Sequence, residues 1–239
     1  MNKIVIIYGS PRTGTTHLYL SFISHPLCQG YNESPEALGF IQKGTHIDKL
    51  WNKTKQEILI LKGSQYCFEF DAIKKIMDTN DIKLIFTDRN ILEVIESMLQ
   101  HPDSVAYGRE DTVLLPVSGL LRKKFLMLWS LTLGLSEDKK IINRMALRYL
   151  WHVESISKEM KEKSLCLIPY ELRLDSLLVF KKLNEFVGLP EDENFYKNIC
   201  NFIYRHISPE RKKEIRDGLL PEVLNEIRES GIDESTMDL

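Results

Sequence analysis

The stretch "GSPRTGTT" at residues 9–16 decides the fold, because it directly follows the β-branched run "IVIIY" and directly precedes a helical pattern. Gly9 and Gly14 have the spacing of a Walker A phosphate-binding loop, G-x-x-x-x-G-K-[ST]. Thr15, however, stands where that loop has its lysine, and the basic residue lies inside the loop, as Arg12. The stretch therefore predicts a buried strand, an anion-binding loop and a helix in succession.

The chemistry of this loop suits an anion. Glycine permits the positive φ angles that turn successive backbone N–H groups toward one point. The helix that follows adds its own N-terminal N–H groups, and an arginine can bind two anion oxygens at once. We expect the anion to be held by Ser10, Pro11, Arg12, Thr13, Gly14, Thr15 and Thr16.

Beyond the loop, short apolar runs of strand length alternate with helical patterns. Such alternation predicts a three-layer α/β fold, a parallel sheet with helices on both faces, with ligands at the carboxyl ends of its strands. We take 1–239 as a single domain whose last seven or so residues, in "DESTMDL", are disordered. The further predicted strands are 57–63, 82–88 and 164–169, and the further predicted helices are 71–81, 91–100, 141–163 and 175–190.

Composition excludes several classes of protein. The net charge of −2 gives no overall field that would attract nucleic acid. The apolar stretch 125–135 predicts a buried helix and is too short to span a membrane, which takes about 20 residues. The four cysteines show no C-x-x-C pairing, so we expect no metal site, no disulfide framework and a cytoplasmic location. Cys67 and Cys166 lie in apolar surroundings and are expected to be buried.

A second basic position follows the strand predicted at 82–88. Arg89 comes at its carboxyl end, and Ser97 follows eight residues later on the next helix. An arginine at this edge of the sheet favours a second anion contact. The alternative is a surface ion pair between Arg89 and Asp88 or Glu93.

Three blocks together resemble the sulfotransferases that use 3′-phosphoadenosine-5′-phosphosulfate (PAPS). They are "GSPRTGTT", "KLIFTDRNILEVIESML" and "IPYELRLDSLLVFKKLNEFVGLP", in the family's order over residues 4–190. The resemblance implies the P-loop-like sulfotransferase fold, PAPS as donor, PAP as product and no metal. It also implies that the loop holds the 5′-phosphosulfate, that Arg89 and Ser97 hold the 3′-phosphate, and that Tyr170 contacts the adenine.

The family resemblance also bears on the catalytic base. Cytosolic members carry a His in a Lys-Thr-His run, and "LKGSQYC" retains the lysine as Lys62 but lacks the His. A second branch, which includes the tyrosyl-protein enzymes, uses a Glu after a His-Pro pair. Here "SHPLCQGYNESPEALGF" supplies such a pair at 25–26 and then Glu33, which we expect to be the base, with Glu36 as the fallback. A solvated loop glutamate is the alternative.

The expected reaction is in-line transfer of a sulfuryl group from PAPS to a hydroxyl. Glu33 would take the proton of the hydroxyl, while Arg12 and Lys62 would stabilise the negative charge on the leaving group. The acceptor is a small molecule, a carbohydrate or a lipid; the sequence does not identify it, and it predicts no oligomeric state. A kinase using Mg-ATP and an inactive nucleotide-binding protein are the alternatives.

The chain departs from the family at two places. His17 stands where cytosolic members often have Trp, and the C-terminal Arg-Lys-Gly segment is absent. Arg205, Arg211 or Lys212 would replace that segment, unless they form a solvated helix face. The sequence shows no partner pattern that would indicate a catalytic role for His46, His101, His152 and His206.

Overall fold

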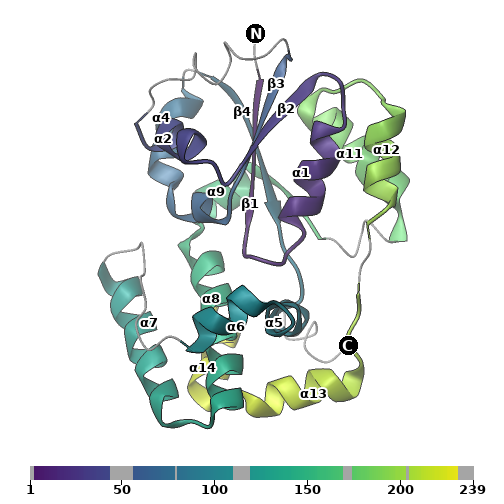
Figure 1. The fold of residues 1–239 in the computed structure, drawn as a ribbon. Helices are drawn as coiled ribbons and strands as arrows, with labels where there is room; N and C mark the ends of the chain where they lie inside the picture. Colours follow the sequence, from purple (N-terminus) through teal and green to yellow (C-terminus); the bar gives the residue numbers. More distant parts are fainter. Residues whose placement is uncertain are drawn as a thin grey trace. The chain divides into compact units, whose positions relative to one another are not determined.

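The computed structural model describes residues 3–43, 56–78, 80–109, 119–168, 174–202 and 205–230. The chain divides into two compact units (Figure 1). We call them the sheet unit, formed by Met1–Gly9, Thr13–Asp88 and Ile156–Tyr204, and the helical unit, formed by Ser10–Arg12, Arg89–Ser155 and Arg205–Leu239. Each unit is described by itself, and the single domain 1–239 stays a prediction.

The sheet unit contains a five-stranded, all-parallel sheet with the order β2-β3-β1-β4-β5. This confirms the predicted parallel α/β fold. The central strand is fully buried from Ile4 to Tyr8, which explains the continuous apolar run. The strands are β1 (Lys3–Gly9), β2 (Cys28–Asn32), β3 (Ile58–Lys62), β4 (Asp81–Thr87) and β5 (Ser164–Leu167).

The sequence analysis missed β2, because its residues "CQGYN" form no apolar run. As an edge strand, β2 needs few apolar residues. Gly30 lets the strand lie close to the helix beside it, since a Cβ there would sit 2.3 Å from the Tyr19 ring. The other edge strand holds a second correction: Cys166, expected to be buried, is exposed on β5, whereas Cys67 is buried as expected.

Helices cover both faces of this sheet (Figure 1). Along β1, Ile4, Ile6 and Tyr8 face one apolar cluster, and Val5 and Ile7 face the other. The first cluster contains residues of α2 (Pro35–Lys43), the 3-10 helix η1 (Ser64–Phe68), α4 (Phe70–Met77) and α9 (Lys158–Glu162). The second contains residues of α1 (Thr15–Ile23), α11 (Ser176–Val187) and α12 (Glu193–Cys200).

The helical unit is built around α8 (Glu137–Ser155). Its Arg144 is fully buried, donates to Thr132 Oγ1 and to the Gly108 carbonyl, and stacks on the Trp129 ring. The elements around α8 are α5 (Ile91–Leu99), α6 (Pro102–Arg109), α7 (Gly119–Leu131), η2 (Thr132–Gly134), α13 (Pro209–Gly218) and α14 (Pro221–Glu229).

Two helix predictions differ from the structure. The single helix predicted over 141–163 is two helices, because α8 ends at Ser155 and the Ser157 hydroxyl caps α9 by accepting the Met160 N–H. The buried helix predicted over 125–135 is only half buried. One face of α7 packs inward through Phe125, Leu128 and Trp129, but Leu126, Met127 and Leu131 are exposed.

None of the helices within the described ranges is long and apolar enough to cross a membrane.

Candidate active site

The loop between β1 and α1 has an unusual backbone. Gly9, Arg12 and Gly14 all have positive φ angles, of 156°, 72° and 94°. Arg12 and Glu33 are the non-glycine residues with positive φ in the described part of the chain, and such conformations cluster at functional sites. Gly14 is the N-cap of α1 and places no side chain on the first N–H groups of the helix. The positive φ angles expected at Gly9 and Gly14 are thus present, and such turns are typical of anion-binding nests.

The loop packs against the end of β4 within the sheet unit. Thr13 is fully buried, and its Oγ1 lies 2.8 Å from Thr87 Oγ1. A Cβ on Gly9 would lie 2.5 Å from the Thr87 carbonyl oxygen. Thr13, predicted to contact the cofactor, thus has a hydroxyl that fixes the loop. Of the other predicted loop contacts, Thr16 is exposed, Pro11 is half-buried, and Ser10 and Thr15 are buried.

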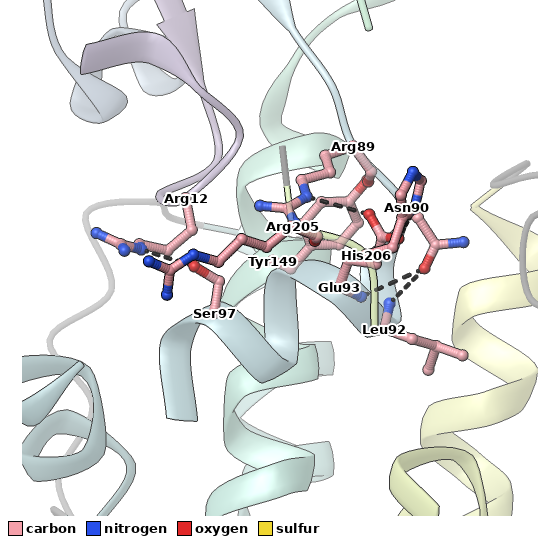
Figure 2. Close-up of polar contacts among 9 residues, drawn as sticks. All are labelled: Arg12, Arg89, Asn90, Leu92, Glu93, Ser97, Tyr149, Arg205 and His206. Atoms are coloured by element: carbon pink, nitrogen blue, oxygen red, sulfur yellow. Dashed lines mark hydrogen bonds and ion pairs between the residues drawn. The ribbon is translucent and has the colours of Figure 1, made fainter. Parts of the chain in front are cut away.

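Arg12 and Ser97 meet in the helical unit. Arg12 Nε donates to Ser97 Oγ at 3.1 Å, across 85 residues of sequence (Figure 2). The sequence analysis assigned both residues to nucleotide phosphates, but to different ones. In the structure the two side chains instead bind one another, through the hydrogen bond from Arg12 to Ser97 of α5.

Arg89 is held from several directions at the start of α5. Its Nε donates to Glu93 Oε2 at 3.2 Å, its Nη2 donates to the Arg205 carbonyl at 2.8 Å, and its own carbonyl accepts the Tyr149 hydroxyl at 3.2 Å (Figure 2). Asn90 caps the helix by accepting two backbone N–H groups. The ion pair with Glu93 was the alternative interpretation of Arg89, yet it is no surface pair, because the Glu93 side chain is 2% exposed.

Glu33 and Lys62 form an ion pair at the carboxyl ends of two adjacent strands. Lys62 is the last residue of β3 and pairs in register with Asn32, the last residue of β2. Glu33 Oε1 therefore lies 2.7 Å from Lys62 Nζ, and the Glu33 N–H donates to the Lys62 carbonyl at 2.7 Å. The lysine side chain is 6% exposed and the carboxylate side chain 51% exposed. The pair thus combines a buried cation with a carboxylate that is open to solvent.

Tyr66 lies close enough to this pair to respond to its charge. Burial, and after it the negative charge of Glu33, raise the pKa of the Tyr66 phenol. Its hydroxyl is buried and has no hydrogen-bond partner within the described residues. The phenol therefore stays neutral beside the carboxylate.

Glu36, the fallback base, has a structural contact. It accepts the Ser34 hydroxyl at 2.5 Å, and Ser34 Oγ in turn accepts the Ala37 N–H at 3.3 Å in the first turn of α2. The structure thus places Glu33, and not Glu36, beside the buried lysine.

His25 has the contacts of a structural histidine. Its Nδ1 accepts the Leu27 N–H at 3.1 Å, so its Nε2 carries the proton and donates to the Pro190 carbonyl at 3.2 Å. These bonds fix the turn that leads into β2. His25 therefore fixes the start of the strand β2, which directly precedes Glu33.

Three other histidines have defined surroundings. The His17 ring packs on Phe202 with ring centres 4.7 Å apart, and burial lowers its pKa. Burial lowers the pKa of His152 to about 4, so this residue is neutral. The sequence suggested no catalytic partner pattern for His206; in the structure its Nδ1 lies 3.1 Å from Glu93 Oε1 (Figure 2).

The C-terminal basic residues behave differently from one another. Arg211 is bound by two carboxylates, with Glu96 at 2.8 Å and Glu214 at 2.7 Å. The backbone carbonyl of Arg205 instead accepts a hydrogen bond from the Arg89 side chain. The remaining predicted cofactor contact, Tyr170, lies outside the described residues.

Sequence reasoning named Glu93 only as a possible surface partner of Arg89, and it missed His206 as a part of this cluster. Glu93 lies midway between Arg89 and Ser97 at four-residue spacing, which puts the three on one helix face and was a usable signal. His206 gave no such signal, because 113 residues separate it from Glu93. Where residues are described, no group of three or more His, Cys, Asp or Glu side chains is arranged to hold a metal ion.

Comparison with known proteins finds no matching family model and no matching curated protein. Solved structures do match. The sulfotransferase domain of the Synechococcus PCC 7002 olefin synthase superposes with a TM-score of 0.55 at 16% identity, covering 97% of this chain and 95% of the domain. The sulfotransferase from Alicyclobacillus acidocaldarius gives 0.51 at 16% identity, with 98% of both chains covered.

A third structure agrees. The sulfotransferase domain from the curacin biosynthetic pathway superposes with a TM-score of 0.50 at 12% identity, over 98% of this chain and 99% of that domain. The five-stranded parallel sheet, its helices on both faces and the strand–loop–helix at residues 3–23 thus identify the fold of this chain as that of the solved sulfotransferases.

Proposed function

We propose that this protein is an enzyme that transfers a sulfuryl group from PAPS to a hydroxyl acceptor, with Glu33 as general base. The observation that carries the proposal is the Glu33–Lys62 pair at the carboxyl ends of β2 and β3. Ligands of open parallel sheets bind at this edge. A half-exposed carboxylate and a buried ammonium group there suit a reaction that moves a proton and develops negative charge.

The donors in the chain fit the charges of PAPS, which supplies the sulfuryl group when bound. The loop offers backbone N–H groups at positive-φ turns, and the start of α1 carries no side-chain cap. Both features favour an anion without a lysine in the Walker position. We assign the 5′-phosphosulfate to this loop.

Glu33 and Lys62 have different roles in the proposed reaction. The Glu33 carboxylate accepts the proton of the acceptor hydroxyl as the new oxygen–sulfur bond forms. Lys62 holds Glu33 in place at 2.7 Å and offers positive charge to the phosphate oxygen from which sulfur departs. Arg12 supplies a second cation for that charge. No step of this scheme uses a metal.

We assign the 3′-phosphate to Arg89 and Ser97, and the adenine to Tyr170. Arg89 is fixed by a buried carboxylate and by the Arg205 carbonyl, so its guanidinium is pre-organised. Ser97 already binds an arginine side chain through its hydroxyl. The acceptor is a small molecule, carbohydrate or lipid that carries a hydroxyl, and we place the reaction in the cytoplasm.

Calorimetric titration with PAP, 5′-AMP and Mg-ATP tests this proposal. We expect PAP to bind at least about tenfold more tightly than 5′-AMP, because only PAP carries the 3′-phosphate that the arginines would meet. A preference for Mg-ATP would overturn the proposal in favour of a kinase. Equal binding of PAP and 5′-AMP would remove the 3′-phosphate site.

A further inference from the structure

Tyr66 carries a hydroxyl that the fold does not use. Its side chain is fully buried, and its hydroxyl has no hydrogen-bond partner among the described residues. Tyr8 belongs to the same apolar cluster and is also fully buried, but its hydroxyl lies 2.6 Å from Ser164 Oγ. A buried hydroxyl without a partner destabilises the fold relative to a phenylalanine in the same place. Packing therefore explains the ring of Tyr66 but not its hydroxyl.

Two elements of the sheet unit place Tyr66 near the Glu33–Lys62 pair. Lys62 ends β3, and Tyr66 follows on η1, where its N–H donates to the Gly63 carbonyl at 3.3 Å. Its ring belongs to the apolar cluster that also contains Phe40 of α2, the helix that begins two residues after Glu33. Burial, and after it the charge of Glu33, raise the pKa of the Tyr66 phenol. The phenol therefore keeps its proton and can donate a hydrogen bond.

In the proposed reaction, Lys62 serves two acceptors. In the structure its ammonium group lies 2.7 Å from Glu33 Oε1. During transfer the same group has to stabilise the charge on the phosphate oxygen from which sulfur departs. An ammonium group that turns toward that oxygen weakens its bond to Glu33 while the carboxylate must stay directed at the acceptor hydroxyl. A base that loses its contact also loses part of the orientation on which the rate depends.

We propose that Tyr66 is a positioning residue for Glu33, and that its hydroxyl donates a hydrogen bond to Glu33 Oε1 when Lys62 turns toward the leaving oxygen. The inference rests on the proposed function, in which Glu33 is the base. Tyr66 itself transfers no proton. The proton of the acceptor hydroxyl goes to Glu33 Oε2, and the acceptor oxygen bonds to sulfur. The bond between sulfur and the phosphate oxygen breaks, and Lys62 stays protonated beside that oxygen.

The first experiment detects this hydrogen bond by NMR of protein whose tyrosines are isotopically labelled at Cζ. The signal that disappears in Tyr66→Phe belongs to Tyr66. We expect this signal to move when PAP, which carries the leaving phosphate, is added to wild type, because the phenol gains a charged acceptor. In Glu33→Ala saturated with PAP it should move much less. An equal displacement in both proteins would overturn the inference, since the charge of PAP alone would then explain it.

The second experiment separates this role from a structural one. Tyr66→Phe should unfold at the wild-type temperature or above it, because the substitution removes a buried hydroxyl that has no partner. Tyr8→Phe is the matched control: it removes a hydroxyl that is bonded to Ser164, and it should lower the Tm by roughly 2–4 °C. If Tyr66→Phe lost as much as the control, its hydroxyl would serve the fold, and the inference would be wrong.

Kinetics test whether the contact acts during transfer. With PAPS as donor and water as the acceptor, Tyr66→Phe should release sulfate with a kcat about tenfold lower and an unchanged KM for PAPS. This is the effect of one hydrogen bond that forms only in the transition state. A kcat equal to that of wild type would contradict the inference.

Failure of the inference is distinguishable from failure of the proposed function. If calorimetry shows that wild type does not bind PAP, the proposed function fails and the inference fails with it. If wild type binds PAP but the Tyr66 signal does not respond through Glu33, the inference alone fails. A response that depends on Glu33, in a protein whose stability does not need the hydroxyl, supports both.

Discussion

Replacing Gly9 by alanine tests the packing of the anion-binding loop. Gly9 has a φ of 156° and pairs with Thr87 at the end of β4. A Cβ would lie 2.5 Å from the Thr87 carbonyl oxygen, 2.7 Å from Thr87 Oγ1 and 2.9 Å from Thr13 Oγ1. The nearest of these atoms is backbone in a paired strand, so it cannot rotate away. The substitution therefore forces the loop and the strand apart.

The magnitude follows from two contributions. Overpacking costs about 1–3 kcal/mol, and the positive φ costs a residue with a Cβ about 1–2 kcal/mol. We expect Gly9→Ala to lower the free energy of unfolding by about 2–5 kcal/mol, which for a chain of this size lowers the Tm by roughly 4–20 °C. PAP affinity should fall as well, because the loop N–H groups move.

Thermal unfolding followed by circular dichroism measures this effect. Gly39→Ala is the matched control: it makes the same chemical change in α2, where a Cβ would meet nothing within 4 Å. Because glycine weakens a helix interior, that variant should gain about 0.5–1 kcal/mol. A Gly9→Ala protein that unfolds at the wild-type temperature would refute the packing argument.

Three further predictions concern single side chains. Glu33→Gln should leave PAP affinity unchanged and lower sulfuryl transfer from PAPS by about 10²–10⁴-fold; full activity would point to another base, such as Glu36. Arg89→Ala should weaken PAP binding strongly, and unchanged affinity would remove Arg89 from the site. Burial raises the pKa of Glu154 from 4.5 to about 7 in spite of its bond to Lys124. Since the folded state then binds the extra proton, stability should fall as the pH rises from about 4.5 to about 7. Urea midpoints above and below this window should show the fall, and Glu154→Gln should abolish it.

The central strands were predictable from the sequence, and the edge strand was not. Strands covered by helices on both faces are mostly apolar, so β1 and β3 stand out as nearly continuous apolar runs and β4 as a run interrupted by Lys83. The edge strand β2 is polar and contains Gly30, which packs under a tyrosine ring. Its sequence resembles that of a loop. An edge strand pairs with a single neighbouring strand, here β3, and needs few buried apolar residues.

The missing strand limited what could be predicted of the candidate site. Glu33 and Lys62 were each selected from a family resemblance, but nothing in the sequence indicated that they touch. Their contact depends on the pairing of β2 with β3 and on the register that sets Asn32 opposite Lys62. The contact between Glu93 and His206 was unpredictable for a similar reason, because 113 residues separate the two and only tertiary packing brings them together.

The backbone gives independent support to two of the residues chosen for their chemistry. Arg12 and Glu33 each hold a positive φ, which costs a non-glycine residue about 1–2 kcal/mol relative to glycine. Both side chains are largely exposed, so burial of apolar surface does not offset that cost. Each is instead fixed by one polar contact, Arg12 by Ser97 and Glu33 by Lys62. Neither strained conformation is explained by packing. Backbone strain at two charged residues that follow the carboxyl ends of strands is typical of functional sites.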